Sequence, residues 1–530
     1  MGMVLSRCIR FCNYIALLLI LSATSGIRPT LADSGTPDPA TAAALAGEIA
    51  HAQRMHTLFP DSAGSAQRTP PVIPKFEQDP DPSGLIATFQ PNGPTETNTN
   101  AFFQNLGTNG RTCFTCHEPQ DGWTVSAQHA RDRFEADPND PLFRLVDGAT
   151  CPSDDVSTPG KRRKAFDLLL DKGLIRIGLP MPSGPTLQFQ ILSVDDPYNC
   201  NTNPATGLTS FTTGTVSTYR RPLPAANLGF LSAIMWDGRE PSLFSQAIDA
   251  TLGHAQASTA PTAAQQQQIV TFEGCTTADT SALCAATPPN SGVFTAQIFD
   301  EDAGFLHALG ASGGPVAIAQ QLASFFIGVN DPLGNNPKNI PFTSIIFNLY
   351  DAWANLTDRD EKAEARAAIA RGEQVFNTIP INITGVGGLN DVLNKPSISG
   401  FCGTCHDTPN TGNHSVKAPL NIGIANAGPN APPVLDISGL PVFTIWCTTG
   451  PLAGKTFEVT DLGRATITGQ CADIGKLKGP ILRGLAARAP YFHNGSAATL
   501  RDVVEFYDQR FSIGLTKQDK SDLVAFLNSL

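Results

Sequence analysis

The chain has 530 residues, of which 41% are apolar, and a net charge of −11. This length allows two or three domains, each with its own apolar core. The acidic balance argues against a nucleic-acid-binding protein, because that function depends on neutralising phosphates with Lys and Arg. The same balance permits a basic partner protein.

The N-terminus has the pattern of a secretory signal peptide. Arg7 and Arg10 precede an apolar run at 14–21 that is too short to span a membrane, and a small-residue pattern ends at Ala32. We therefore expect residues 1–32 to be removed on export, which leaves a periplasmic or secreted protein with no stable membrane insertion. An uncleaved anchor is the alternative. Removal would leave 33 basic against 47 acidic residues and change the net charge from −11 to −14.

The next segment, residues 33–96, is rich in Ala, Pro, Asp and Thr. One short helix is expected near 40–58, followed by an extended strap on the surface, because the many prolines interrupt helices. A further helix is expected at about 98–106, immediately before a cysteine motif.

Three later segments complete the expected elements. Residues 255–295 have low complexity, with four glutamines in a row at 265–268, and are interpreted as a loop. Residues 358–376 carry Ala, Arg and Glu at high density and predict a helix. Residues 517–530 predict a closing helix, because their apolar side chains fall on one helical face.

Two motifs of the form Cys-x-x-Cys-His occur, one at 113–117 and one at 402–406. Two thiols at this spacing can form thioethers with both vinyl groups of one haem, and the adjacent histidine then reaches the iron. A zinc site would favour paired Cys-x-x-Cys units without an obligatory histidine, and a redox dithiol would favour a thioredoxin-like context. The sequence therefore predicts two covalently bound haem c groups. They are attached at Cys113, Cys116, Cys402 and Cys405, with His117 and His406 as iron ligands.

The order of helix, haem motif, loop-rich stretch and closing helix occurs twice. We therefore expect a mainly α fold in which two c-type cytochrome domains face each other, with long loops and few short strands. The expected N-terminal haem domain spans residues 97–345, and the expected C-terminal haem domain spans residues 346–530.

Six cysteines of the exported part lie outside the haem motifs. An even number in an exported protein suggests disulfides. Pairing between sequence neighbours is the simplest of fifteen connectivities. It joins Cys151 to Cys200, Cys275 to Cys284, and Cys447 to Cys471.

The positions of the methionines limit the second ligand of each iron. No methionine follows Met235, so the second haem needs another residue type. Its candidates are His414, His493, Tyr491 and Tyr507. For the first haem, the distance of Met181 from His117 suits a methionine ligand, and an apolar loop position suits this residue equally well.

Two further segments resemble the bacterial di-haem cytochrome c peroxidases. The first runs from Phe230 to Arg239, contains Ile-Met-Trp-Asp-Gly-Arg, and is followed by Gln246. The second runs from Gly479 to Tyr507 and contains Ala-Pro-Tyr-Phe-His-Asn-Gly. The tryptophylquinone-forming enzymes of the MauG type share both segments. With the haem motifs in matching order, the resemblance covers about residues 97–530.

The resemblance implies that the N-terminal haem meets peroxide and that the C-terminal haem admits or stores electrons. Trp236 would be the relay between the haems, Gln246 a pocket residue, and Arg239 a haem-binding residue. At the position of the methionine ligand of ordinary peroxidases this chain has Tyr507, as the MauG-type enzymes do. A phenolate is an anionic donor that lowers the reduction potential and stabilises ferric and higher oxidation states.

Two departures from the peroxidase pattern concern the first haem. The histidine that blocks this iron before activation is replaced by Thr213, so the iron should be open unless Met181 or His254 binds it. The expected catalytic glutamate is Gln256, whose amide cannot carry a proton. His254 could take that role, because its unperturbed pKa lies near neutrality.

A third departure concerns calcium. Two ligand positions of the family's inter-domain calcium are Arg221 and Arg488 here. Two arginines would repel a cation, so calcium is not expected.

The leading hypothesis is an exported di-haem oxidoreductase that uses hydrogen peroxide, or oxygen plus electrons, at the His117 haem. His254 and Gln256 would assist O–O cleavage, and Trp236 would share an oxidising equivalent with the second haem. A redox partner protein or an organic molecule would be the reductant. Two alternatives remain: a di-haem electron-transfer cytochrome with Met181 on the first iron, and a di-haem oxygenase acting on an organic substrate.

Overall fold

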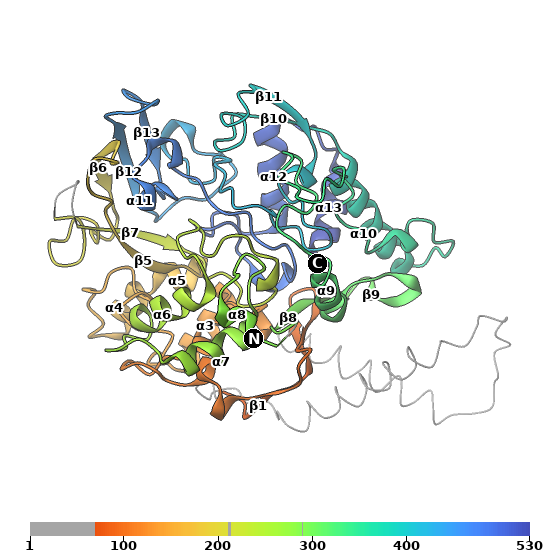
Figure 1. Ribbon diagram of the computed structural model, residues 1–530, viewed down its shortest axis with the longest axis horizontal. Coiled ribbons are helices and arrows are strands. Elements are labelled where there is room, and N and C mark those ends of the chain that lie inside the picture. Colours follow the sequence, from red (N-terminus) through yellow and green to blue (C-terminus); the bar gives the residue numbers. More distant parts are fainter. Residues whose placement is uncertain (1–68, 210–213, 289) are drawn as a thin grey trace. The chain divides into compact units, whose positions relative to one another are not determined.

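The computed structural model describes residues 69–209, 214–288 and 290–530, and all of them belong to one compact unit (Figure 1). The expected signal peptide at 1–32 and the expected helix near 40–58 lie outside the described residues. In the part of the chain that is described, no helix is long and apolar enough to cross a membrane.

Helices are the dominant elements, in line with the expected mainly α class. They are α3 (Ala127–Ala136), α4 (Pro159–Ala165), α5 (Asp167–Lys172), α6 (Leu243–Gly253), α7 (Ala263–Glu273), α8 (Ala282–Ala285), α9 (Gly314–Leu322), α10 (Glu361–Thr378), α11 (Ala465–Thr468), α12 (Leu500–Phe511) and α13 (Lys517–Asn528).

The strands are short, as expected, but more numerous than expected. They are β1 (Val72–Ile73), β2 (Phe76–Asp81), β3 (Gly84–Phe89), β4 (Thr95–Glu96), β5 (Ile175–Pro180), β6 (Phe189–Asp195), β7 (Thr215–Arg220), β8 (Phe294–Asp300), β9 (Gly304–Phe305), β10 (Ile381–Thr384), β11 (Ser397–Gly400), β12 (Val442–Cys447) and β13 (Thr456–Val459). Three pairs are two-stranded (β1–β4, β5–β7 and β10–β11), and two larger sheets have the orders β2-β3-β8-β9 and β13-β12-β6.

Two predicted helices are confirmed and pack against each other. α10 covers most of the predicted range 358–376, and α13 covers most of 517–530. Gly372 of α10 permits close approach, because a Cβ atom there would lie 2.0 Å from the carbonyl oxygen of Asp522 on α13. The apolar faces of both helices belong to one buried core cluster.

The predicted helix at about 98–106 is wrong. Two short 3-10 turns, Thr97–Thr99 and Ala101–Phe103, take its place. The side chain of Asn100 accepts a hydrogen bond from the N–H of Phe102 while its own backbone stays extended. This bond caps the second turn, and the extended backbone at Asn100 separates the two turns.

The predicted loop at 255–295 is also wrong, because it contains α7 and α8 and the start of β8. α7 begins with a capping box in which Thr262 and Gln265 satisfy each other's backbone donors. Glutamine has a good helix propensity, so the glutamine run is compatible with this helix. Ile269 and Phe272 bury the inner face of α7.

Residues 69–96 are extended, but they do not lie only on the surface. β2 and β3 form an antiparallel hairpin, and β3 also pairs with β8. Because β3 lies inside this sheet, its residues Ile86, Ala87 and Thr88 are buried. This pairing with a strand far away in sequence could not be seen in the local proline-rich composition.

A three-stranded sheet links segments on both sides of the boundary expected at 345. β6 pairs with β12, and β12 pairs with β13. The inward side chains of this sheet form a buried cluster that includes Phe189, Ile191, Phe443 and Ile445. The N-terminal and C-terminal parts of the chain are therefore joined by strand pairing and by a common core.

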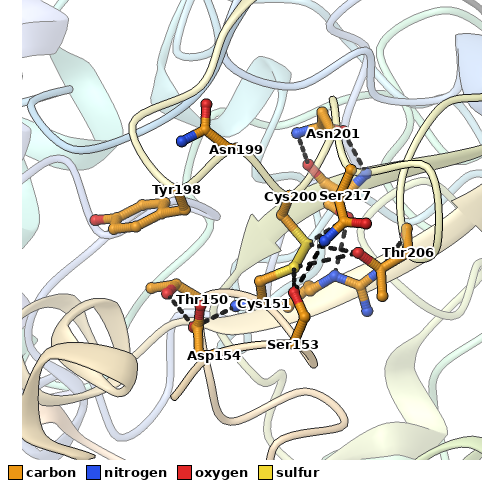
Figure 2. The surroundings of a disulfide bond; sticks show 12 residues. Thr150, Cys151, Ser153, Asp154, Tyr198, Asn199, Cys200, Asn201, Thr206 and Ser217 are labelled. Carbon is orange, nitrogen blue, oxygen red and sulfur yellow. Dashed lines mark hydrogen bonds between the residues drawn. A yellow bond between two sulfur atoms is a disulfide. The ribbon is translucent and has the colours of Figure 1, made fainter. Parts of the chain in front are cut away.

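The three expected disulfides are confirmed. Figure 2 shows the bridge between Cys151 and Cys200, which joins two loops. Asp154 supports the first loop by accepting hydrogen bonds from the hydroxyl of Thr150 at 2.6 Å and from the N–H of Cys151 at 2.7 Å. The bridges close segments of different lengths, with sequence separations of 49, 9 and 24 residues.

Candidate haem sites

The first Cys-x-x-Cys-His motif forms one tight turn against a cavity. Cys113–Thr115 is a 3-10 turn, and the N–H groups of Cys116 and His117 both donate to the carbonyl oxygen of Cys113 at 3.2 Å. Both cysteines and His117 line the cavity. The Nδ1 atom of His117 is hydrogen-bonded to the carbonyl oxygen of Trp123 at 2.9 Å, which leaves Nε2 available to a metal.

The second motif repeats this arrangement. Cys402–Thr404 is a 3-10 turn, and the N–H of His406 donates to the carbonyl oxygen of Cys402 at 3.0 Å. Nδ1 of His406 is bonded to the carbonyl oxygen of Gly412 at 2.6 Å. Cys402, Cys405 and His406 line a second cavity, whose wall is mostly aliphatic and aromatic.

Both cavities fit a covalently attached haem. The space not occupied by protein atoms, with the adjoining open solvent included, is about 1500 Å³ at the first cavity and about 1580 Å³ at the second. The four motif cysteines are not in disulfides, whereas the other six described cysteines are. Burial raises the pKa of Cys116 to about 11 and that of Cys402 to about 12.

Trp236 lies where the two cavities meet. Among the described residues, only Trp236, Lys478 and Pro480 line both cavities. The indole Nε1–H of Trp236 donates to the carbonyl oxygen of Arg221 at 2.8 Å, and the carbonyl oxygen of Trp236 accepts the N–H of Lys478 at 2.7 Å. The position of the tryptophan is therefore fixed at both its side chain and its backbone.

A buried ion-pair network follows Trp236. Arg220 contacts Asp237 at 2.6 Å and Asp461 at 2.6 Å, and all three side chains are almost fully buried. Arg239, the expected haem-binding residue, lines the first cavity and contacts Asp237 at 3.1 Å. Burial alone would raise the pKa of Asp237, but Arg220 and Arg239 lower this pKa below its usual value. The carboxylate of Asp237 is therefore charged.

The turn around Trp236 recurs around His493. In each copy a β-bridge closes the turn. The residue before Trp236 or His493 has a positive φ, and so does the glycine two positions after that tryptophan or histidine. A capped helix comes next, α6 in the first copy and α12 in the second. The bridges Ile234–Glu240 and Tyr491–Ala497 show that the copies are offset by 257 positions.

This internal repeat relates the far walls of the two cavities. With the same offset, Tyr507 of α12 corresponds to Ala250 of α6. Tyr507 lines the second cavity and Ala250 lines the first. A methyl group thus stands in the first site where a phenol stands in the second. The spacing was visible in the sequence as a repeat, and the sequence analysis missed it.

Tyr507 is the candidate second ligand whose hydroxyl has no hydrogen-bond partner among the described residues. Its ring lies 6.5 Å from the ring of His406, and within the described chain its hydroxyl makes no hydrogen bond. The hydroxyl of Tyr491 donates to a carbonyl oxygen at 3.0 Å. His414 also lines the second cavity, and its Nδ1 atom lies 3.4 Å from the carboxylate of Asp407. His493 is buried against Trp236 and does not line the second cavity. Burial raises the pKa of Tyr507, so forming the phenolate requires a cation beside it.

One face of α6 forms a wall of the first cavity. Gln246, Ala250 and His254 lie at helical spacing on this face, and all three line the cavity. Nδ1 of His254 is hydrogen-bonded to Asp147, and the same carboxylate is ion-paired with Arg111. Burial alone would raise the pKa of Asp147, but Arg111 and His254 lower this pKa to about 2.

Several residues of the first cavity were not predicted from the sequence. Arg111 and Asp147 orient His254 as described above. Glu273, the last residue of α7, also lines this cavity, is 6% exposed, and has one carboxyl oxygen without a hydrogen bond. Burial raises its pKa to about 8. No local motif marks these residues, because their positions depend on how distant segments pack.

Two expected residues are not brought to the first cavity. Gln256 is exposed, adopts a φ of +54°, and accepts a hydrogen bond from the side chain of Asn109 at 3.2 Å; it does not line this cavity. Met181 packs in a core cluster with Phe189 and Cys447 and is likewise absent from the lining. Thr213, the position of the missing blocking histidine, lies outside the described residues.

Arg221 and Arg488 form a buried pair close to the junction of the cavities. The guanidinium of Arg488 donates to the carbonyl oxygens of Ile481, Arg483 and Gly484 at 2.7 to 3.0 Å. Arg221 donates to the carbonyl oxygen of Arg488 at 3.0 Å. Each guanidinium thus binds carbonyl oxygens that would otherwise be free for a cation.

Comparison with known proteins adds partial matches to peroxidases. The chain is 44% identical over 78 residues to cytochrome-c peroxidase IdrP2 of Denitromonas iodatirespirans, which is 13% of this chain and 21% of the relative. It is 42% identical over 77 residues to cytochrome c peroxidase Ccp of Escherichia coli (strain K12), 14% of this chain and 16% of the relative. It is 34% identical over 99 residues to cytochrome c551 peroxidase of Nitrosomonas europaea, 16% of this chain and 30% of the relative.

These matches span less than a third of each relative's length, so they support similarity to cytochrome c peroxidases over part of the chain. No protein-family model matches. A solved MauG-like protein associated with microbial copper homeostasis is 19% identical and aligns with 59% of this chain and 76% of its own. Its TM-score of 0.27 is too low to bear on the fold.

Proposed function

We propose that this chain is an exported di-haem c-type oxidoreductase that uses hydrogen peroxide as oxidant at the first site. The observation that carries this proposal is the difference between the two cavities. Both begin at a Cys-x-x-Cys-His turn and meet at Trp236, but Ala250 stands where the second cavity has Tyr507. An iron held by His117 would therefore keep its far side open to a small oxidant. The partial similarity to cytochrome c peroxidases supports the same reaction class.

The residues around the first site are suited to proton transfer. Reduction of one hydrogen peroxide to two waters consumes two electrons and two protons. When bound at His117, haem iron would supply the redox chemistry. Asp147 accepts the Nδ1–H of His254, so the Nε2 atom of His254 is left to take a proton from one peroxide oxygen and deliver it to the other.

The residues between the sites are suited to electron transfer. Trp236 contacts both cavities and is held by hydrogen bonds to Arg221 and Lys478. Tyr507 would bind the second iron as a phenolate and favour its oxidised states, with electrons supplied by a redox partner protein or an organic reductant. The electron-transfer alternative would need Met181 on the first iron, and this residue lies in a separate core cluster.

Electron paramagnetic resonance of the ferric protein tests the proposal. One high-spin and one low-spin haem are expected, and rapid spectral change should follow the addition of hydrogen peroxide. Two low-spin haems without a reaction would overturn the proposal and favour an electron carrier. The His254→Ala variant should keep the ferric spectrum and react more slowly with peroxide. A change of the first haem in His254→Ala from low-spin to high-spin would instead identify His254 as an iron ligand.

A further inference from the structure

Lys478 is a buried lysine at the junction of the two cavities. The residue is 8% exposed and lines both of them. Its backbone is held on one side by the bond from its N–H to Trp236. On the other side, the preceding Leu477 forms a β-bridge with Leu420. The start of the side chain is therefore fixed where the cavities meet.

In the described part of the chain, no acidic side chain pairs with Lys478. Within the described residues its ammonium makes no hydrogen bond and no ion pair. Arg220 and Arg239, which line the first cavity, are both paired with Asp237. The charged group that acts on Lys478 is Arg488, a second cation, and burial together with Arg488 lowers the pKa of Lys478 to about 8. A buried ammonium is costly without a counter-charge, so this position calls for an anion.

The anion that fits is a haem carboxylate. Each cavity fits a haem, and a haem carries two propionates. The junction brings a cation to the edge of both cavities, whereas the described part of the chain offers Lys478 no carboxylate. A free organic anion would have to enter between two covalently bound cofactors. A propionate would already be tethered there.

We propose that the Lys478 ammonium pairs with a haem propionate at this junction and thereby raises the reduction potentials of both haems. Reduction of a ferric haem adds one electron, so a nearby positive charge favours the reduced form. The same charge disfavours removal of an electron from the adjacent indole of Trp236. Lys478 is thus a positioning and electrostatic residue. The inference rests on the proposed function only in requiring two haems.

Redox titration of the holoprotein tests this role without using turnover. Lys478→Met and Lys478→Gln remove the charge, and about a tenfold fall in the equilibrium constant for reduction of each haem is expected, a downward shift of about 59 mV. Lys478→Arg keeps the charge and should keep both midpoints. Lys476→Met is the matched control, because Lys476 is also buried and already pairs with Asp473 at 3.1 Å; its midpoints should not change.

Unchanged midpoints in both neutral variants would overturn the inference, as would a shift confined to one haem. Should neither neutral variant incorporate two haems, Lys478→Arg decides the question by resonance Raman spectroscopy. The different geometry of the guanidinium should move the propionate-bending bands, and unchanged bands would overturn the pairing. Shifted midpoints in a protein inert to peroxide would overturn the proposed function and leave this inference standing. Unshifted midpoints in an active peroxidase would overturn this inference and leave the proposed function standing.

Discussion

The Nδ1 atom of His254 is hydrogen-bonded to the carboxylate of Asp147, which is ion-paired in turn with Arg111. This bond fixes which ring nitrogen of His254 faces the first cavity. His254→Ala should lower kcat/KM for peroxide by about 10²- to 10⁴-fold, the range of a general acid–base residue. Asp147→Asn should cause a smaller loss, because the ring remains but is less well oriented. Gln256→Ala is the control and should leave the rate unchanged, since its side chain lies outside the cavity.

Ala250→Tyr should close the first site. The substitution places a phenol at the position that Tyr507 occupies in the second copy of the repeat. The high-spin signal of the first haem should disappear, and the reaction with peroxide should be lost while both haems remain attached. Ala250→Val is the control for bulk and should keep a high-spin signal. A high-spin signal that survives in Ala250→Tyr would contradict the equivalence of the two helices.

Tyr507→Phe should change the second haem and little else. The hydroxyl makes no bond within the described chain, so the free energy of unfolding should change little through the protein contacts. Loss of an anionic donor should raise the reduction potential of the second haem and alter its ferric spectrum. Tyr491→Phe is the matched control. It loses the 3.0 Å hydrogen bond to Leu485 at a cost of about 1 kcal/mol and should keep both spectra.

Glu273 should make stability fall as pH rises. Burial raises its folded-state pKa from about 4.5 to about 8, so between these values the folded protein binds the extra proton. The free energy of unfolding should therefore decrease across this pH range, by about 5 kcal/mol at most. Glu273→Gln should remove this contribution, as followed by denaturant unfolding at several pH values. Glu301→Gln, at an exposed position, should keep the wild-type slope. An unchanged slope in Glu273→Gln would contradict a buried neutral carboxyl group.

Removal of divalent metals should leave the protein's stability unchanged. The guanidinium of Arg488 already binds three carbonyl oxygens, and Arg221 binds the carbonyl oxygen of Arg488. A chelator should not shift the thermal unfolding midpoint, and a shift that calcium reverses would contradict this expectation. Arg488→Met should cost about 2–4 kcal/mol, because buried carbonyl oxygens lose their donor. Arg501→Met, at an exposed position, should cost far less.

The features that depend on short-range chemistry follow from the amino-acid sequence alone. The haem motifs place two thiols and an imidazole within five residues, so their local turn is the same in both copies. The disulfides join neighbouring cysteines, and α10 and α13 follow from helix-forming composition and periodicity. The helix expected at about 98–106 does not form, because the backbone is extended at Asn100 between two short turns.

The set of residues that meet at the two cavities depends on the packing of distant segments. Asp147, Glu273 and Lys478 come from segments far apart in the chain, and no local pattern distinguishes them from other charged residues. His254 lines the cavity and Gln256, two residues later, does not, because the backbone turns at the end of α6. The pairing of β6 with β12 also joins segments that are far apart in the chain. These contacts form when distant segments bury apolar surface together, and a linear sequence does not show which segments will do so.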